Sequence, residues 1–400
     1  MIAGVEGTDL MRIPGMPDYD AAALAKLRAQ DAEIAAVFDA HGYDFIEPPI
    51  LEPADVFLEQ SGEDIRRRIY AFNDASGQEL CLRPELTIPA CRMYLRGAGA
   101  GGPARLSYNG PAFRFQPPGR DRPCQFLQAG VECLGIDDKE AADAEVLAVT
   151  LAAVQATGLS EYAIEIGDVG LFFGLIDQLQ LPERWRLRLK HQFWRPGQLQ
   201  DLINRLSGAD GAGADRTAFL AALGALDGEQ AKAAVEDVLQ MAGIAPAGGR
   251  TIDEITVRFL EQAADARSGA LSQEIVALFD AFFDISGGCA GAIAGLRDLT
   301  RQAGIALDAE IARFERRCDL ADKRGVPVDQ LRFAARFERG LQYYTGFVFE
   351  LRAQAEGVPG PIAGGGRYDR LLAQLGADKE IPAIGGAIRT EWLLLARGEA

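Results

Sequence analysis

Three short segments carry side chains that could bind a small polar ligand. In CLRPELT, Glu85 and Thr87 are two residues apart, so in an extended chain they lie on the same side and can hold an ammonium group. An alternative is a strand end with two solvated polar groups, which these residues alone favour. In FERGLQYYTGFVFE, residues 337–350, an arginine, two adjacent tyrosines and an aromatic run are typical of a pocket wall.

The third segment, QFLQAGVECLG, places Gln128 and Glu132 four residues apart. The two-residue period of a strand brings both to one face, beside the apolar Phe126 and Val131. A carboxylate in such a strand is costly unless it is paired. The pattern therefore predicts either a ligand cation or a partner arginine, and Arg114 in FRFQ is the candidate partner.

The elements that must position these residues follow from the local patterns. Asp20 is expected to cap a helix that Gly42 ends, and YDFIEPPILEP reads as a strand broken by two prolines at an edge. RRIYAFND and QELCLRPE predict a hairpin around DASG, and LTIPACRMYLR predicts a helix. ARLSYNG, AFRFQ and QFLQAGVECLG predict three strands, and 138–157 an amphipathic helix.

The predicted secondary structure changes after this helix. Residues 171–322 read as helix after helix, and the strand pattern returns from QLRFAARF to the last segment, IPAIGGAIRTEWLLLA. GGGRYD predicts a tight glycine turn before a helix rather than a phosphate loop. This order favours one α+β domain, residues 1–170 and 323–400, interrupted by a helical insertion at 171–322. Three separate domains are the alternative.

The amino-acid composition argues against several classes of function. The 400 residues carry a net charge of −17 without a basic run, which argues against nucleic-acid binding. There is neither a signal-peptide pattern nor a long apolar run, so we expect a cytoplasmic protein that does not enter the membrane. The six cysteines are scattered and the two histidines have no metal-ligand spacing, so we expect free thiols, no metal and no cofactor.

The order of these segments resembles histidyl-tRNA synthetase, a class II synthetase, over nearly the whole chain. RGLQYYTG and QFLQAGVE resemble that family's histidine pocket most specifically. The resemblance implies an antiparallel sheet flanked by helices, with a helical insertion. It also implies that Glu85 and Thr87 hold the amino group, while Glu132 and Tyr344 reach the imidazole. The complete implied site is Glu85, Thr87, Arg114, Gln128, Glu132, Arg339, Tyr343 and Tyr344, with both arginines facing the carboxylate.

The sequence departs from the synthetases in three respects. Gln116 stands where they have a glutamate that faces adenine, and Gln342 where they usually have an aspartate. Trp392 replaces an arginine that grips ATP phosphates, with Arg389 three residues earlier, and indole cannot imitate the guanidinium fork. The chain also ends eight residues after Trp392, where a synthetase would continue into an anticodon-binding domain of roughly a hundred residues.

An intact amino-acid pocket with altered ATP and tRNA contacts resembles the regulatory subunits of ATP phosphoribosyltransferase. That resemblance implies a non-catalytic subunit that joins a short catalytic subunit in the first step of histidine biosynthesis and responds to histidine. It also implies a homodimer formed through YDFIEPPILEP. Two alternatives stay open. One is an enzyme that adenylates histidine with Arg114, Arg120 and Arg122, and the other is an interaction protein whose pocket binds nothing.

Overall fold

The fold is taken from a computed structural model of the chain. The described residues are 13–60, 66–97, 99–117, 122–208, 222–223, 226, 228–241, 252–253, 255–257, 259–260, 270–337 and 343–399. Three residues with predicted roles, Arg120, Arg339 and Gln342, lie outside them. By internal contacts the chain divides into a large unit, Met1–Gln178 with Phe282–Ala400, and a small unit, Leu179–Ala281.

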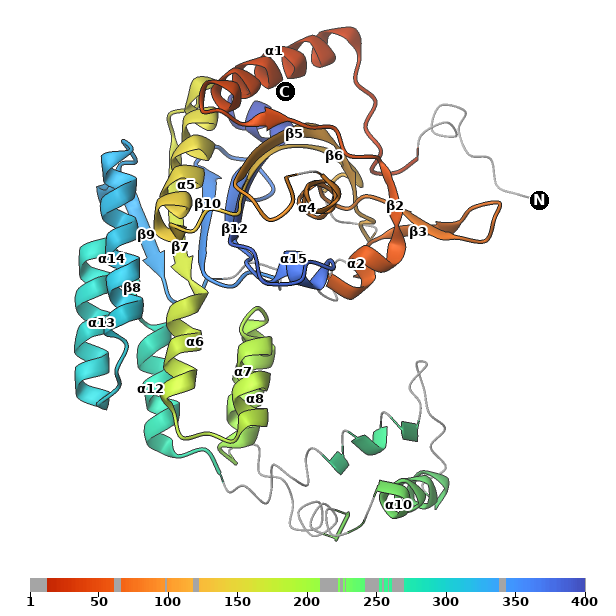
Figure 1. The fold of residues 1–400 in the computed structure, drawn as a ribbon, viewed down its shortest axis with the longest axis vertical. Coiled ribbons are helices and arrows are strands. Elements are labelled where there is room, and N and C mark those ends of the chain that lie inside the picture. The colour runs from red at the N-terminus through yellow and green to blue at the C-terminus, as the bar shows by residue number, and fades with distance from the viewer. Residues whose placement is uncertain are drawn as a thin grey trace. The chain divides into compact units, whose positions relative to one another are not determined.

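A nine-stranded sheet forms the centre of the large unit (Figure 1). The run of strands from β5 to β7 is antiparallel throughout, while β1 pairs with β5 and β7 pairs with β9 in parallel. This matches the predicted α+β class. In sheet order the strands are β1 (Asp44–Phe45), β5 (Ala104–Phe113), β6 (Gln125–Leu134), β12 (Ala383–Arg389), β11 (Ala363–Arg367), β10 (Phe347–Ala353), β7 (Tyr162–Asp168), β9 (Leu331–Ala334) and β8 (Ser286–Gly287).

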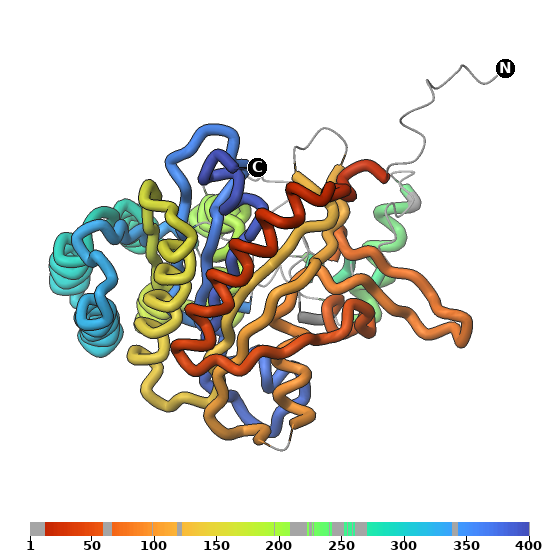
Figure 2. The backbone as a smooth tube through the Cα atoms, turned by 90° about the horizontal axis from the view of Figure 1, so that it is seen from above, coloured from red at the N-terminus to blue at the C-terminus, as the bar shows by residue number. Residues whose placement is uncertain are grey.

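Helices pack on this sheet where the apolar spacing predicts them. The Asp20 carboxylate caps α1 (Ala21–Ala40) by accepting from the backbone N–H of Ala23, which confirms the predicted cap. The Asp138 carboxylate caps α5 (Lys139–Ala156) in the same way. Figure 2 shows α1 running alongside the neighbouring strands, with α5 beside it. The further helices of the unit are α6 (Val169–Gln178), α13 (Cys289–Ala303), α14 (Asp308–Lys323), α15 (Leu371–Gln374) and α16 (Thr390–Ala396), together with the 3-10 turn η1 (Val328–Gln330).

A second, three-stranded sheet has the order β2 (Leu51–Pro53), β4 (Glu79–Leu82) and β3 (Tyr70–Asn73). The β3–β4 pair is the hairpin predicted around DASG, and Gly77 supplies its left-handed residue at φ 86°. It projects away from the large sheet in Figures 1 and 2. The helix α2 (Ala54–Gln60) follows β2 directly. The prolines of YDFIEPPILEP separate β1 from β2, as expected of a proline-broken strand.

Three local predictions are wrong. ARLSYNG and AFRFQ do not form separate strands, because β5 runs unbroken through Pro111 to Phe113. GGGRYD does not open with a turn: its glycines form most of β11, where side chains at 365 and 366 would collide with Phe349 and Tyr344. Thr87 does not continue an extended chain, because α4 (Thr87–Arg96) begins there.

The elements described in the small unit are helices. It contains α7 (Glu183–Gln192), α8 (Pro196–Leu206), α10 (Gly228–Met241) and most of α12 (Gln273–Phe283). Buried Leu223, Ala231 and Val235 form one of its apolar clusters. Its boundaries at 179 and 281 are narrower than the predicted insertion at 171–322. The difference arises because α13 and α14 pack against β8, β9 and α5 of the large unit. Among the described helices, none has the length and apolarity that crossing a bilayer requires.

Candidate functional site

The large unit contains a cavity of about 380 Å³, a size suited to a small ligand. One end is buried and polar, formed by residues of α4, β6 and the segment before β10. The other end is half-buried to exposed and is rich in arginine. The side chains used below are Arg68, Glu85, Thr87, Arg114, Arg122, Gln128, Tyr343, Tyr344, Arg352, Tyr368, Arg389 and Trp392, all of which line the cavity.

Glu85 and Thr87 enter the buried end at the start of α4. The Glu85 carboxylate accepts hydrogen bonds from the backbone N–H groups of Thr87 at 2.7 Å and Ile88 at 2.8 Å. Glu85 therefore caps α4, and its oxygens are shared between the helix and the cavity. Burial raises the pKa of Glu85, while the two backbone hydrogen bonds oppose the rise. The side chains are brought together as expected, but by a helix start rather than by a strand.

Glu132 lies directly behind the cavity wall rather than on its surface. Its side chain is fully buried and accepts hydrogen bonds from the hydroxyls of Tyr108, at 2.9 Å, and Tyr368. The close approach of β12 is possible because residue 385 is glycine, since any side chain there would collide with the carboxylate. Burial raises the pKa of Glu132 to about 7, against the hydrogen bonds that lower it. The partner of this carboxylate is thus a pair of tyrosines, not the arginine that the sequence suggested.

Tyr108 connects Glu132 to the cavity surface. Its hydroxyl accepts from Gln128 Nε2 at 3.3 Å and lies 3.5 Å from the Thr87 hydroxyl. Gln128 and Glu132 do share one face of β6, as the two-residue period predicts. The lining residues Thr87, Gln128 and Tyr368 and the buried Glu132 therefore belong to one hydrogen-bonded group centred on Tyr108. A polar ligand that contacts the lining residues would therefore change the hydrogen bonding of the Glu132 carboxylate.

The tyrosine pair closes the buried end. The rings of Tyr343 and Tyr344 meet edge to face with centroids 5.1 Å apart, and Tyr343 also meets Tyr368 at 5.8 Å. The next residue, Thr345, is tied to the end of β11: its N–H donates to the carbonyl of Arg367 at 2.7 Å. Its hydroxyl accepts from the Asp369 N–H at 3.1 Å. The backbone after the tyrosines is therefore fixed to β11 and the turn that follows it.

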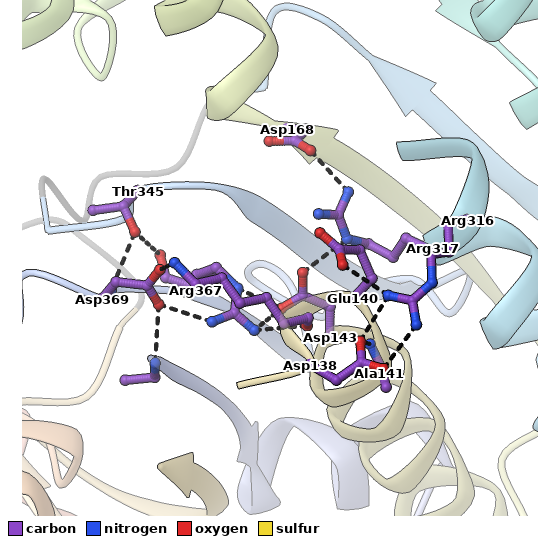
Figure 3. A network of polar contacts seen from close by, with 12 residues as sticks. Asp138, Glu140, Ala141, Asp143, Asp168, Arg316, Arg317, Thr345, Arg367 and Asp369 are labelled. Atoms are coloured by element: carbon purple, nitrogen blue, oxygen red, sulfur yellow. Dashed lines mark hydrogen bonds and ion pairs between the residues drawn. The ribbon is translucent and has the colours of Figure 1, made fainter. Parts of the chain in front are cut away.

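A buried ionic network holds that turn (Figure 3). Asp143 of α5 accepts from Arg367 Nε and from Arg317 Nε, both at 2.8 Å. Arg317 of α14 continues to Asp168 at 2.8 Å, and Arg367 continues to Asp369 at 2.8 Å. Each of these five side chains is at most 10% exposed, so the charges are stabilised by one another rather than by water. The network links the wall of the cavity to α5 and α14.

At its other end the cavity presents cationic and aromatic groups. The guanidinium of Arg389 lies 3.4 Å from the ring centre of Phe126, and that of Arg114 lies 5.4 Å from the same ring. Trp392 is buried in α16, with the guanidiniums of Arg389 and Arg122 at 5.3 and 5.8 Å from its ring. Indole thus occupies part of the wall, while Arg389 brings a positive charge into the cavity from the end of β12.

Six of the eight side chains of the implied histidine site line one cavity: Glu85, Thr87, Arg114, Gln128, Tyr343 and Tyr344. Glu132 stands behind the wall, and Arg339 lies outside the described residues. The sequence reading missed Tyr108 and Tyr368. Tyr108 lies in ARLSYNG, which predicts a strand, and Tyr368 in GGGRYD, which predicts a turn, so neither segment by itself indicates a ligand site. Within the described ranges, no three His, Cys, Asp or Glu residues are grouped so that they could hold a metal ion.

Solved structures with a similar fold include histidyl-tRNA synthetases. A Bacillus halodurans structure described as an ATP phosphoribosyltransferase regulatory subunit/histidyl-tRNA synthetase matches with a TM-score of 0.65 at 23% identity, over 97% of this chain and 83% of that one. Histidyl-tRNA synthetase from Nostoc matches with a TM-score of 0.62 at 19% identity, over 98% and 77%. The fold is therefore that of a histidyl-tRNA synthetase-like protein of class II.

Sequence comparison identifies the protein family more specifically. The sequence model of the histidyl-tRNA synthetase family matches residues 15–257 and 235–393. ATP phosphoribosyltransferase regulatory subunits from Chelativorans sp. and Mesorhizobium japonicum are each 38% identical to this chain. These matches cover 92% and 90% of this chain and 97% and 95% of the two relatives. The chain belongs to the family of ATP phosphoribosyltransferase regulatory subunits.

Proposed function

We propose that this chain binds histidine in the buried end of the cavity and regulates a catalytic subunit of ATP phosphoribosyltransferase, without catalysing a reaction of its own. The observation that carries the proposal is that one cavity combines groups suited to an amino acid at its buried end with an indole at its other end. The buried end offers an acceptor carboxylate, two hydroxyl-bearing tyrosines and an amide, while Trp392 forms part of the wall at the other end. The names of the relatives support the partner.

The charged groups of histidine match side chains along the cavity, from Glu85 at the buried end to Arg114 at the arginine-rich end. Its ammonium group would donate to Glu85 and Thr87, at the start of α4. Its carboxylate would face Arg114, whose Nε already donates to the carbonyl of Pro84 at 2.7 Å and so fixes the side chain. On the basis of the resemblance, we propose that Arg339 also faces the carboxylate of the ligand. Gln128, held on Tyr108, would line the site between them.

The imidazole would lie against the tyrosines. A ring N–H can donate to the oxygen of Tyr368, whose own hydrogen goes to Glu132. The carboxylate would then act on the ligand through a phenol instead of by direct contact. Tyr343 and Tyr344 would enclose the ring, since both rings border the cavity. An amino acid with an apolar side chain would leave the Tyr368 oxygen without that partner, which provides selectivity.

Histidine can influence a partner because the segment that encloses it is fixed to helices outside the cavity. Thr345 follows the tyrosines and binds Arg367 and Asp369, and Arg367 is joined through Asp143 to Arg317 of α14. Allosteric regulation requires a second site whose ligand affinity changes with the first. We assign that second site to the catalytic subunit.

The chain would also pair with a second copy of itself through the segment of β1 and β2. Phe45 is 61% exposed, Leu51 47% and Ile50 44%, although all three are large and apolar. Such side chains on short edge strands are typical of a surface that is covered in an assembly. The resemblance to class II synthetases also implies a homodimer at this segment.

Calorimetry with histidine tests the ligand. The full chain should bind histidine, and Tyr368→Phe should weaken binding by about 5- to 150-fold, corresponding to about 1–3 kcal/mol for one buried polar contact. Tyr162→Phe is the matched control, because its hydroxyl accepts only from Gln155 on the surface and should leave the affinity unchanged. If wild type binds no histidine, or Tyr368→Phe binds it equally well, the assignment of this end of the cavity is wrong.

Histidine adenylation is the second candidate, because five arginines line the cavity and favour an anion such as a triphosphate: Arg68, Arg114, Arg122, Arg352 and Arg389. Against it, Trp392 stands where the synthetases have a phosphate-binding arginine. Histidine-dependent exchange of pyrophosphate into ATP separates the two functions, since a sensor has no such activity.

A further inference from the structure

The large unit contains a second cavity, of about 320 Å³, whose lining comes mainly from α5, α6 and α14. It borders directly on the first cavity, the one proposed for histidine. Tyr343 and Tyr344 line the first cavity, and the next two residues, Thr345 and Gly346, line the second. The volume is at the lower end of the range for small-molecule sites. The second cavity can therefore hold a compact metabolite next to the tyrosine pair.

One face of α14 supplies charged side chains to this cavity. Glu310, Arg313 and Arg317 follow one another at spacings of three and four residues, so they lie on the same side of the helix, and all three line the cavity. Glu310 packs closely on α6, where a side chain at Gly174 would come within 3.0 Å of its Cγ. Gly174 thus leaves room for this carboxylate beside the cavity.

Arg317 offers a hydrogen-bond donor that is not used within the described part of the chain. Its Nε donates to Asp143 and its Nη1 to Asp168, both at 2.8 Å, while Nη2 has no recorded acceptor there (Figure 3). The side chain is only 7% exposed, so this donor has little access to bulk water. Because Arg317 lines the cavity and Nη2 is not fully enclosed, a ligand oxygen in the cavity could accept from it.

Two lining carboxylates offer the complementary acceptors. Glu310 Oε1 accepts from Arg313 at 3.0 Å, and Glu140 Oε2 accepts from Arg316 at 2.8 Å. The other oxygen of each carboxylate has no recorded donor among the described residues. Glu310 and Glu140 are 26% and 13% exposed, so both lie nearer the surface than Arg317. Each can accept a further hydrogen bond from an ammonium group.

The charges of the lining are balanced. The positive side chains are Lys139, Arg313, Arg317 and Arg367. The negative ones are equal in number, namely Glu140, Asp168, Glu310 and Asp369. A ligand with a single charge would upset this balance in a largely buried place, which is costly. A ligand that carries one charge of each sign preserves it and matches the free donor and the free acceptors.

We propose that the second cavity binds a free amino acid as a zwitterion. The carboxylate of the ligand accepts from Arg317 Nη2, and its ammonium group donates to Glu310 and Glu140. The bound ligand would contact the segment of Thr345 and Gly346, which fixes the backbone after the tyrosine pair. Binding here does not require histidine in the first cavity, because different residues supply the contacts.

Calorimetry of the full chain with each of the standard L-amino acids, one at a time, tests the site. At least one should bind wild type in a phase that Glu310→Gln weakens by about tenfold or more, because the variant loses a charged acceptor. Glu315→Gln is the matched control. It makes the same change on α14, in an exposed pair with Arg297, and should leave the affinity unchanged. The proposal fails if no amino acid binds, if every one that binds does so equally well to Glu310→Gln, or if both variants weaken binding alike.

Derivatives of the amino acid that binds test which of its charges are recognised. Its amide lacks the carboxylate, and its N-acetyl form lacks the ammonium group. Each derivative should bind about tenfold or more weakly than the parent, since each loses one charged hydrogen bond. An N-acetyl form that binds as well as the parent would show an anion site, and an equally good amide a cation site. Either result would overturn the assignment of a zwitterion.

Discussion

The hydroxyl of Tyr108 donates to Glu132 Oε1 at 2.9 Å across two neighbouring strands. The contact depends on Gly130, which lies opposite Tyr108 in the β5–β6 register and leaves room for its ring. On the other side of β6, Gly385 leaves room for the carboxylate itself. Three strands therefore bury one acid beside the cavity, and within the described part of the chain its recorded side-chain partners are hydroxyl groups rather than cations.

That environment predicts how stability depends on pH. The pKa of Glu132 is raised to about 7 in the folded chain, so the folded state holds the proton more tightly than the unfolded state. The protonated Glu132 side chain therefore contributes to the free energy of unfolding. This contribution is complete below about pH 4, is lost as the pH rises through 7, and amounts to about 3 kcal/mol at most. Glu132→Gln should remove this loss, so urea unfolding from pH 5 to 8 should show a shallower decline for the variant. Parallel declines for the two proteins would contradict this.

The ionic network predicts a large cost for removing its central acid. Asp143→Asn leaves Arg367 and Arg317 without their shared carboxylate in a buried setting, which should cost about 3–5 kcal/mol. Glu310→Gln serves as the control, because its pair with Arg313 lies near the surface and should contribute within about 1 kcal/mol. Urea denaturation measures both. Similar losses in the two variants would mean that the network contributes no more than a surface pair.

The dimer proposal predicts a change of mass in solution. Phe45→Glu places a charge on the exposed edge strand β1, and it should convert a dimer into monomers at micromolar concentration. Leu187→Glu, an equally drastic change at a residue that is 60% exposed in the small unit, should leave the dimer intact. Sedimentation equilibrium distinguishes the species. A wild-type monomer would contradict the dimer itself, whereas dissociation only of the Leu187 variant would place the interface elsewhere.

The adenylation alternative predicts an activity that a sensor lacks. Trp392 lies in the wall of the cavity, and Gln116 stands where the resemblance to the synthetases implies a glutamate, so the isolated protein should show no histidine-dependent exchange of pyrophosphate into ATP. An exchange rate of about 1 per second or faster would be typical of an enzyme. Such a rate would contradict the proposed function of a sensor without catalytic activity.

The periodic elements of the fold could be predicted from local patterns, because capping and apolar spacing are local. Examples are α1 with its Asp20 cap and the β3–β4 hairpin. The strand β11 could not be predicted in this way. Its glycines are required because Phe349 and Tyr344 pack closely against them in the folded chain. The site residues were grouped by resemblance to a family. The partners of Glu132 were missed, because Tyr108 and Tyr368 reach it only in the folded sheet.

Phosphoribosyl-ATP formation by a short-form catalytic subunit, measured with and without this chain and with and without histidine, tests the central claim most directly. The chain should raise the activity of the catalytic subunit, and histidine should then lower it by about 5- to 150-fold, the range of a typical allosteric coupling. Histidine should have no such effect when the chain is omitted. A catalytic subunit that is equally active without the chain, or equally inhibited by histidine without it, would contradict the account.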